Sequence, residues 1–107
     1  MKDYLEIAGR QYRVEVNWNA VVAFLSATGK DTWEGLSSFA AVKPSDLAPL
    51  LAAAINEGER LEGRESHFTA EEIGASCGFE IITAFLPIYQ KQTMPKSSVP
   101  EEGKKKD

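Results

Sequence analysis

Reactive side chains are scarce in this sequence. Among its 107 residues there is one cysteine, Cys77, and one histidine, His67. A single cysteine excludes an internal disulfide and is typical of proteins in a reducing cytoplasm. Because a zinc site needs about four protein ligands, or three and a water, these two residues do not predict a metal site. We expect His67 to lie in a solvated loop, and Cys77 to be a small buried apolar side chain rather than a nucleophile.

The sequence also lacks an excess of positive charge and a long apolar run. Its formal net charge is −4, whereas nucleic-acid binding requires a concentrated positive surface. The apolar, uncharged stretch at residues 81–89 is far shorter than the ~20 residues that cross a bilayer. The first residues do not resemble a signal peptide. We therefore expect a cytoplasmic protein that binds neither nucleic acid nor membranes.

Patterns typical of catalytic sites are missing too. The glycines occur at turn or helix-end spacings and form no phosphate-binding loop. Glu71 and Glu72 are adjacent, but neighbours on a helix point in different directions and cannot share one reacting centre. A catalytic pair of Cys77 and His67 would need an orienting third group and an oxyanion donor. We expect no enzymatic activity and no cofactor.

The N-terminal residues predict a β-hairpin. Gly9-Arg10 suits a two-residue type II′ turn, which requires glycine first. This register pairs Ile7 with Tyr12, Leu5 with Val14, Glu6 with Arg13 and Tyr4 with Glu15. Its apolar pairs share one face, and the Glu6–Arg13 pair lies on the other. Because two strands alone are marginal in water, the apolar face is expected to rest on helices.

Three helices are predicted next. Asn17 is a good N-cap for the first, and Gly29 a good end. The expected buried stripe of this helix is Trp18, Val21, Val22 and Leu25. A short, weak helix follows, opened by Asp31 and Glu34, with Trp33, Leu36 and Phe39 expected to face inward. A third is expected from about Ser45 to Glu57, with Leu47, Leu50, Leu51 and Ile55 inward and Gly58 as its end.

Residues 59–67 are polar and are expected to form a solvated loop. Beyond them, Thr69 and Glu72 form a capping box, and Phe68 can pack onto Ile73. This last helix should be interrupted at Cys77-Gly78 and kinked or stopped at Pro87. Residues 94–107 have the composition of a flexible charged tail. The expected fold is thus a single α+β domain over residues 1–93, an antiparallel two-stranded hairpin packed on about four helices.

The predicted last helix has more than one apolar face. If the small core does not bury all of these side chains, one face is left for a partner helix. The candidate partner-binding residues are Phe79, Ile82, Phe85, Leu86 and Tyr89. The alternative is that the core consumes all of them.

Four local matches give this order of elements a likeness to a known family. They are residues 7–14 of the hairpin (IAGRQYRV), residues 21–29 (VVAFLSATG), residues 44–51 (PSDLAPLL) and residues 68–73 (FTAEEI). Together they cover roughly residues 3–93, and the pattern resembles the tail assembly chaperones of long-tailed phages and prophages. The extended loop at residues 59–66 and Pro87 depart from the pattern.

The resemblance implies a non-catalytic chaperone that coats the tape-measure protein, delivers it to tail-tube subunits, and is absent from the finished virion. In many members a −1 ribosomal frameshift near the end of the gene extends the product, and residues 103–106 (GKKK) fit a slippery codon run; the alternative is a solvated lysine tail. Two other classes stay open: a small tail-completion or adaptor protein, and, more remotely, a small helical transcriptional regulator. The sequence leaves homo-oligomers through the hairpin edge or the last helix equally open.

Overall fold

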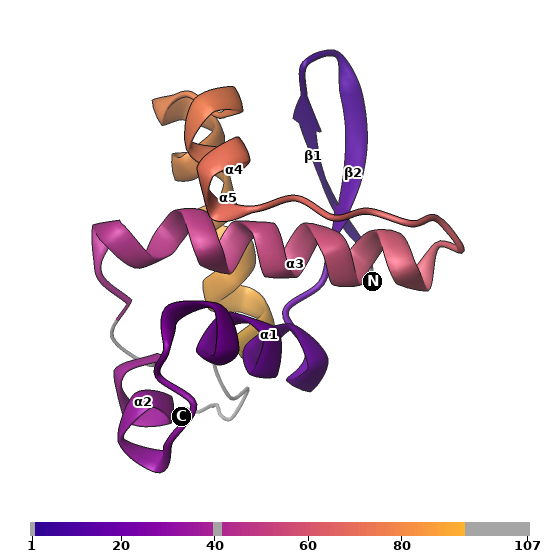
Figure 1. The fold of residues 1–107 in the computed structure, drawn as a ribbon. Coiled ribbons are helices and arrows are strands. Elements are labelled where there is room, and N and C mark those ends of the chain that lie inside the picture. Colours follow the sequence, from indigo (N-terminus) through magenta and orange to yellow (C-terminus); the bar gives the residue numbers. More distant parts are fainter. Residues whose placement is uncertain (1, 40–41, 94–107) are drawn as a thin grey trace, which may run out of the picture.

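The computed structural model of the chain describes residues 2–39 and 42–93 (Figure 1). The predicted tail, residues 94–107, and the side chain of Phe39 lie outside the described residues. The elements, in order, are β1 (Asp3–Ile7), β2 (Arg10–Val14), α1 (Trp18–Thr28), α2 (Trp33–Phe39), a short 3-10 helix η1 (Pro44–Asp46), α3 (Leu47–Leu61), α4 (Ala70–Ser76) and α5 (Phe79–Thr93). The expected fold class, a hairpin on a small helical bundle, is confirmed.

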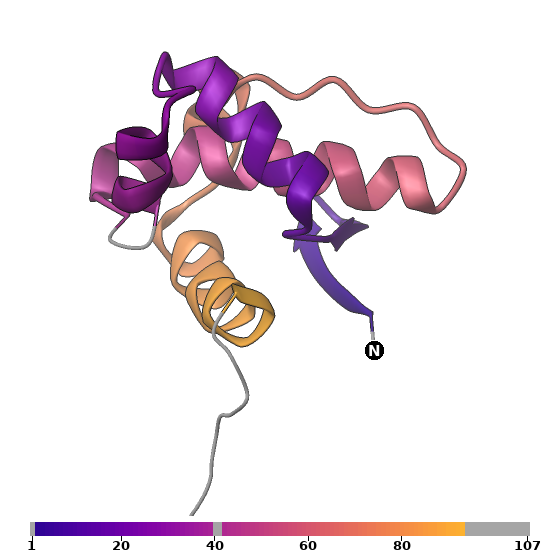
Figure 2. The same ribbon diagram turned by 90° about the horizontal axis from the view of Figure 1, so that it is seen from below.

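Helix α3 runs through the middle of the molecule. In Figure 1 the hairpin stands on one side of α3 and α1 lies on the other. Figure 2 shows α5 on the side of α3 where the hairpin lies. The segment between α3 and α4 runs back along α3 in both views. The core lies between these elements, and its largest fully buried side chains are Phe24, Phe85, Leu50, Leu51, Ile55 and Ile73.

The hairpin forms, but its turn is not the predicted one. The turn residues are Ala8 and Gly9, with φ angles of 54° and 81°, and two positive φ angles in succession are typical of a type I′ turn. The strands pair Ile7 with Arg10 and Leu5 with Tyr12. The predicted Gly9-Arg10 turn and its four pairings are therefore wrong.

The true register nevertheless buries the predicted face. Each pairing is shifted by two positions, and a shift of two keeps a side chain on its own side of the sheet. Leu5, Ile7 and Val14 are buried accordingly. The left-handed Ala8 costs on the order of 1 kcal/mol. In this register the Arg10 guanidinium lies 4.6 Å from the ring centre of Tyr12 and 3.1 Å from Glu59, which favours the register despite that cost.

Both predicted ends of α1 are confirmed, but its predicted buried stripe is not. Asn17 Oδ1 accepts a hydrogen bond from the Ala20 N–H at 3.0 Å, and Gly29 ends the helix with a φ of 71°. The buried side chains are Ala20, Val21, Phe24 and Leu25. Trp18 and Val22, which were expected to belong to the buried stripe, are 61% and 42% exposed. The helix is rotated relative to the prediction: Phe24, which was not in the predicted stripe, is buried, and α1 packs against α3.

Helix α3 is longer than expected, because Gly58 does not end it. A Cβ atom at position 58 would overlap the carbonyl group of Arg13 on β2. The glycine therefore allows strand and helix to touch, and the helix continues to Leu61. The expected solvated loop at 59–67 is correspondingly wrong at its start: Glu59 is 1% exposed and accepts hydrogen bonds from the Arg10 and Arg64 side chains.

The capping box and the interruption predicted for the last part of the chain are confirmed. Thr69 Oγ1 accepts from the Glu72 N–H at 3.1 Å, and the Glu72 carboxylate accepts from the Thr69 N–H at 2.9 Å. Cys77 has an extended backbone, which separates α4 from α5. Pro87 does not stop α5, which continues to Thr93. Gln92 near its end donates to the Val14 carbonyl and accepts from the Val16 N–H, so contacts with the hairpin hold this last part of the helix in place.

Candidate binding groove

The predicted partner-binding residues of α5 do not form one exposed face. Phe85 is completely buried and Tyr89 is 6% exposed, because both side chains belong to the hydrophobic core and α5 packs against β1. Ile82 and Leu86 are half-buried. Phe79 alone of the five has an exposed side chain, at 85%. The expectation that this set leaves a contiguous apolar surface is corrected: the core takes Phe85 and Tyr89.

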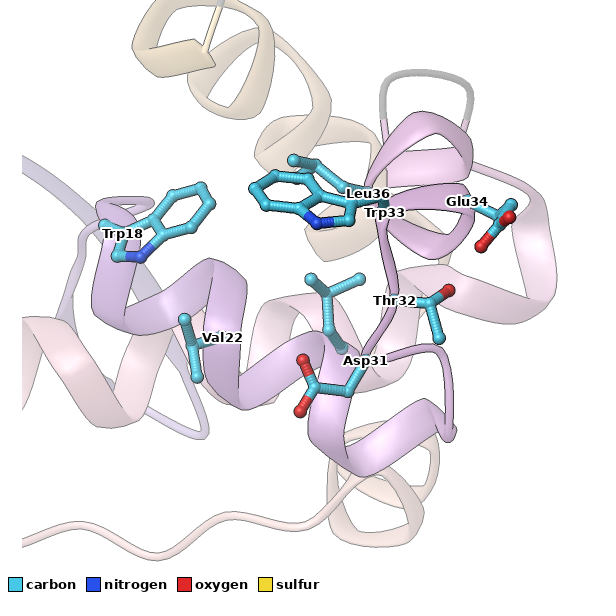
Figure 3. A pocket seen from close by; sticks show the side chains of 8 residues that line it. Trp18, Val22, Asp31, Thr32, Trp33, Glu34 and Leu36 are labelled. Carbon is cyan, nitrogen blue, oxygen red and sulfur yellow. The ribbon is translucent and has the colours of Figure 1, made fainter.

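The exposed apolar surface lies instead between α1 and α2. Trp18 and Val22 project from α1, and Trp33, at 82% exposed, projects from α2. Figure 3 shows the two indole rings on opposite sides of an open groove. Its volume is about 510 Å³, and its lining is completed by Leu25, Asp31, Thr32, Glu34 and Leu36. We call this feature the tryptophan groove.

The turn between α1 and α2 sets the width of the groove. Thr32 Oγ1 accepts from the Gly35 N–H at 3.0 Å and so caps α2, in the place predicted for Asp31. A Cβ atom at position 35 would overlap the Lys30 carbonyl, so the glycine lets α2 fold back tightly. The Lys30 ammonium group lies 3.2 Å from the Asp46 carboxylate, at the start of α3. These contacts fix Trp33, just inside α2, relative to α1.

The groove combines an apolar floor with an acidic edge. Val22, Leu25 and Leu36 contribute aliphatic surface, and the indoles form the two walls. Asp31 and Glu34 are exposed carboxylates at the α2 side. Such an arrangement suits an apolar segment that carries a positive charge near its edge.

The sequence reasoning placed Trp18 and Trp33 in the core, although a signal against this was present. Each tryptophan has polar neighbours on both sides, Asn17 and Asn19 in one case and Thr32 and Glu34 in the other. A second stripe, Ala20, Val21, Phe24 and Leu25, also fits a helical period. It buries a phenylalanine and leaves Asn17 and Asn19 free to donate hydrogen bonds to Glu57.

A second pocket, of about 340 Å³, is lined mostly by polar and charged residues and lies between α1, α3 and the segment before α4. Glu57 accepts hydrogen bonds from Asn17, Asn19 and Arg60 there, at 2.6–3.2 Å. The Arg60 guanidinium, together with the two asparagine amides, lowers the Glu57 pKa from an ordinary 4.5 to about 2, against the opposing effect of burial. Because this carboxylate is fully engaged by neighbouring donors, the pocket is a structural ion-pair site.

His67 and Cys77, the histidine and the cysteine of the sequence, lie in different environments. His67 is exposed in the segment before α4, as expected. Cys77 is half-buried, whereas it was expected to be buried. Burial still raises the pKa of its thiol, whereas a nucleophilic cysteine needs a lowered pKa. Within residues 2–39 and 42–93 there is no cluster of three or more His, Cys, Asp or Glu side chains placed to hold a metal ion. No described helix is long and apolar enough to span a membrane.

Comparisons of the chain with protein-family models, with curated proteins and with solved structures found no match. The interpretation of the tryptophan groove therefore rests on its own residues.

Proposed function

We propose that this chain is a non-catalytic tail assembly chaperone of a long-tailed phage, and that it binds a helical segment of the tape-measure protein in the tryptophan groove. The observation that supports binding is the pair of exposed indoles, Trp18 and Trp33, across an apolar floor. Tryptophan is strongly enriched among residues that dominate binding energy. Its large ring also loses little conformational entropy when a partner covers it.

The occupant is an amphipathic helix with its apolar side chains inserted between the indoles. Grooves between two helices commonly take such a segment, anchored by side chains spaced one helical turn apart. A tape-measure protein is a long helical chain whose apolar stripes would aggregate if left uncovered. A chaperone would cover these stripes until tail-tube subunits assemble around the tape-measure protein. The carboxylates of Asp31 and Glu34 favour a lysine or arginine at the edge of the bound helix. The choice of this partner rests on the family resemblance.

Co-expression with the tape-measure protein of the same phage tests the proposal. Trp18→Ala and Trp33→Ala should each reduce the soluble fraction of the tape-measure protein, and should weaken binding of its helical peptides at least 10-fold. Phe79→Ala is the control, because it removes an aromatic ring that is at least as exposed as either indole and does not line the groove. If the two tryptophan variants bind the peptides as tightly as the wild type, the groove is not the site.

A second measurement separates the chaperone from a structural component. A chaperone is released before the tail is complete, so mass spectrometry of purified particles should not detect the chain. Its presence at a fixed copy number would support the tail-completion alternative. A gel-shift titration at low salt addresses the regulator alternative, and we expect no complex with DNA because the net charge is −4.

A further inference from the structure

We infer that the free edge of β1 is a self-association site, at which a second copy of this chain pairs antiparallel to form a continuous four-stranded sheet. The described sheet has two strands and therefore two edges. Helix α3 covers the outer edge of β2, whereas the outer edge of β1 is uncovered in the described part of the chain. The inference does not depend on the proposed function.

The outer edge of β2 is closed by α3. The Arg13 N–H donates to the Glu59 carboxylate at 3.1 Å, and the Glu15 N–H donates to the Ala54 carbonyl at 3.1 Å. Gly58 brings the helix against the Arg13 carbonyl. A row of unpaired backbone groups invites aggregation, and here a helix covers it.

The outer edge of β1 has no such cover. Tyr4 lies opposite Arg13 in the ladder. The Arg13 N–H points away from β1, toward Glu59, so Tyr4 and Arg13 form a non-hydrogen-bonded pair. The backbone N–H and C=O of Tyr4 therefore point away from β2. Those of Glu6, two residues further along the strand, point the same way. In the part of the chain that the structure describes, no hydrogen bond joins the outward N–H groups of Tyr4 and Glu6 to another residue. The strand carries neither proline nor a bulge, two of the usual protections of an edge. Its exposed charges, Lys2 and Glu6, have opposite signs, so a second copy can pair with them.

The side chains on the solvent face of β1 select a second β1 as the occupant. Lys2, Tyr4 and Glu6 are exposed, whereas Leu5 and Ile7 face the core. An antiparallel pair of β1 strands centred on Tyr4 places each Lys2 opposite Glu6 of the other copy, and the two Tyr4 rings opposite each other. Opposite charges and aromatic pairs across strands each contribute about 0.2–1 kcal/mol, in addition to the backbone hydrogen bonds.

Other registers of the same pair are less favourable. Centring on Glu6 sets two carboxylates opposite each other, which is destabilising. Centring on Leu5 brings Ala8, a turn residue with a φ of 54°, opposite Lys2. Lys2 already contacts Glu62 at 3.2 Å, but an exposed ion pair of this kind is worth little and is readily exchanged.

A charge-swap cycle on the full chain tests the register. Sedimentation equilibrium of the wild type should show a monomer–dimer equilibrium. Lys2→Glu and Glu6→Lys should each raise the dimer dissociation constant at least 10-fold, because each sets like charges opposite one another. The double variant restores opposite charges and should return the constant to within about 3-fold of the wild type. Both residues are exposed, and circular dichroism checks that the fold is retained.

Disulfide trapping gives an independent measurement. Opposing residues of a hydrogen-bonded antiparallel pair have Cα atoms about 5.5 Å apart, within the range that a disulfide bridges. In a Cys77→Ala background, Tyr4→Cys should therefore give a covalent dimer under mild oxidation, whereas Glu6→Cys, which faces Lys2 of the other copy, should not. Three results would each overturn the inference: a wild type that stays monomeric at about 1 mM, a dimer unaffected by the charge reversals, and equal trapping of both cysteine variants.

Discussion

Gly58 of α3 lies directly against the backbone carbonyl of Arg13 on β2. A Cβ atom at this position would overlap that carbonyl and stand 3.0 Å from the Val14 N–H. Because position 58 has no side chain, the hairpin and the central helix can come this close. It also positions Glu59, the next residue, to accept from the Arg13 N–H. Closure of the β2 edge therefore depends on this glycine.

Gly58→Ala should destabilise the protein. In an exposed helix interior alanine is more favourable than glycine by about 1 kcal/mol, but here strand and helix must move apart. We expect a net loss of about 2–3 kcal/mol, as for other overpacked sites, measured by urea unfolding. Gly74→Ala in α4 is the control, because nothing lies within 4 Å of its added Cβ. A Gly58→Ala protein as stable as the wild type would contradict the close contact.

Glu57 should make stability depend on pH in acid. Its pKa in the folded protein is about 2, compared with 4.5 ordinarily, chiefly because Arg60 donates to it. Because the pKa is lower in the folded protein, the ionised carboxylate stabilises the fold, and this contribution is complete at a pH above the pKa of the unfolded chain, 4.5. The contribution is lost as the pH falls from 4.5 to about 2. The loss should be about 3 kcal/mol. Glu57→Gln should lower stability at pH 7 and reduce its slope over that pH range. Parallel curves for the two proteins would show that Glu57 does not contribute.

The two phenylalanines of α5 should respond very differently to truncation. Phe85 is fully buried and Phe79 is 85% exposed. Phe85→Ala leaves a cavity in the core and should cost about 3–5 kcal/mol of unfolding free energy. Phe79→Ala should change stability by no more than about 0.5 kcal/mol. Denaturant unfolding of both variants measures this, and similar losses for the two would contradict the orientation of α5.

Asn56 should hold the segment before α4 against α3. Its side chain accepts from the Phe68 N–H at 2.9 Å and donates to the Phe68 carbonyl at 3.0 Å, as a backbone partner would. This places the Phe68 ring 5.3 Å from that of Tyr12. Asn56→Ala should cost about 1–3 kcal/mol and speed hydrogen exchange of the Phe68 amide. His67→Ala, which alters an exposed neighbour, should leave that exchange rate unchanged.

Much of the local structure could be predicted from the sequence because local chemistry determines it. The N-cap Asn17, the left-handed Gly29 and the capping box of Thr69 and Glu72 each act within a few residues. The alternating pattern of the hairpin likewise determined which face is buried, whichever turn was chosen, because the two registers differ by two positions.

Tertiary structure decided the features that depend on contacts between several elements. Which side of α1 faces inward depends on how well Phe24 fits against α3, and a helical period cannot rank two overlapping apolar stripes. The role of Gly58 depends on a strand more than forty residues earlier in the chain. In the same way, burial of Phe85 and exposure of Trp33 follow from the area that the hairpin and α3 can cover. The sequence by itself thus determined the elements and those ends that local caps specify, whereas only packing decided where α3 ends and which apolar side chains are left on the surface.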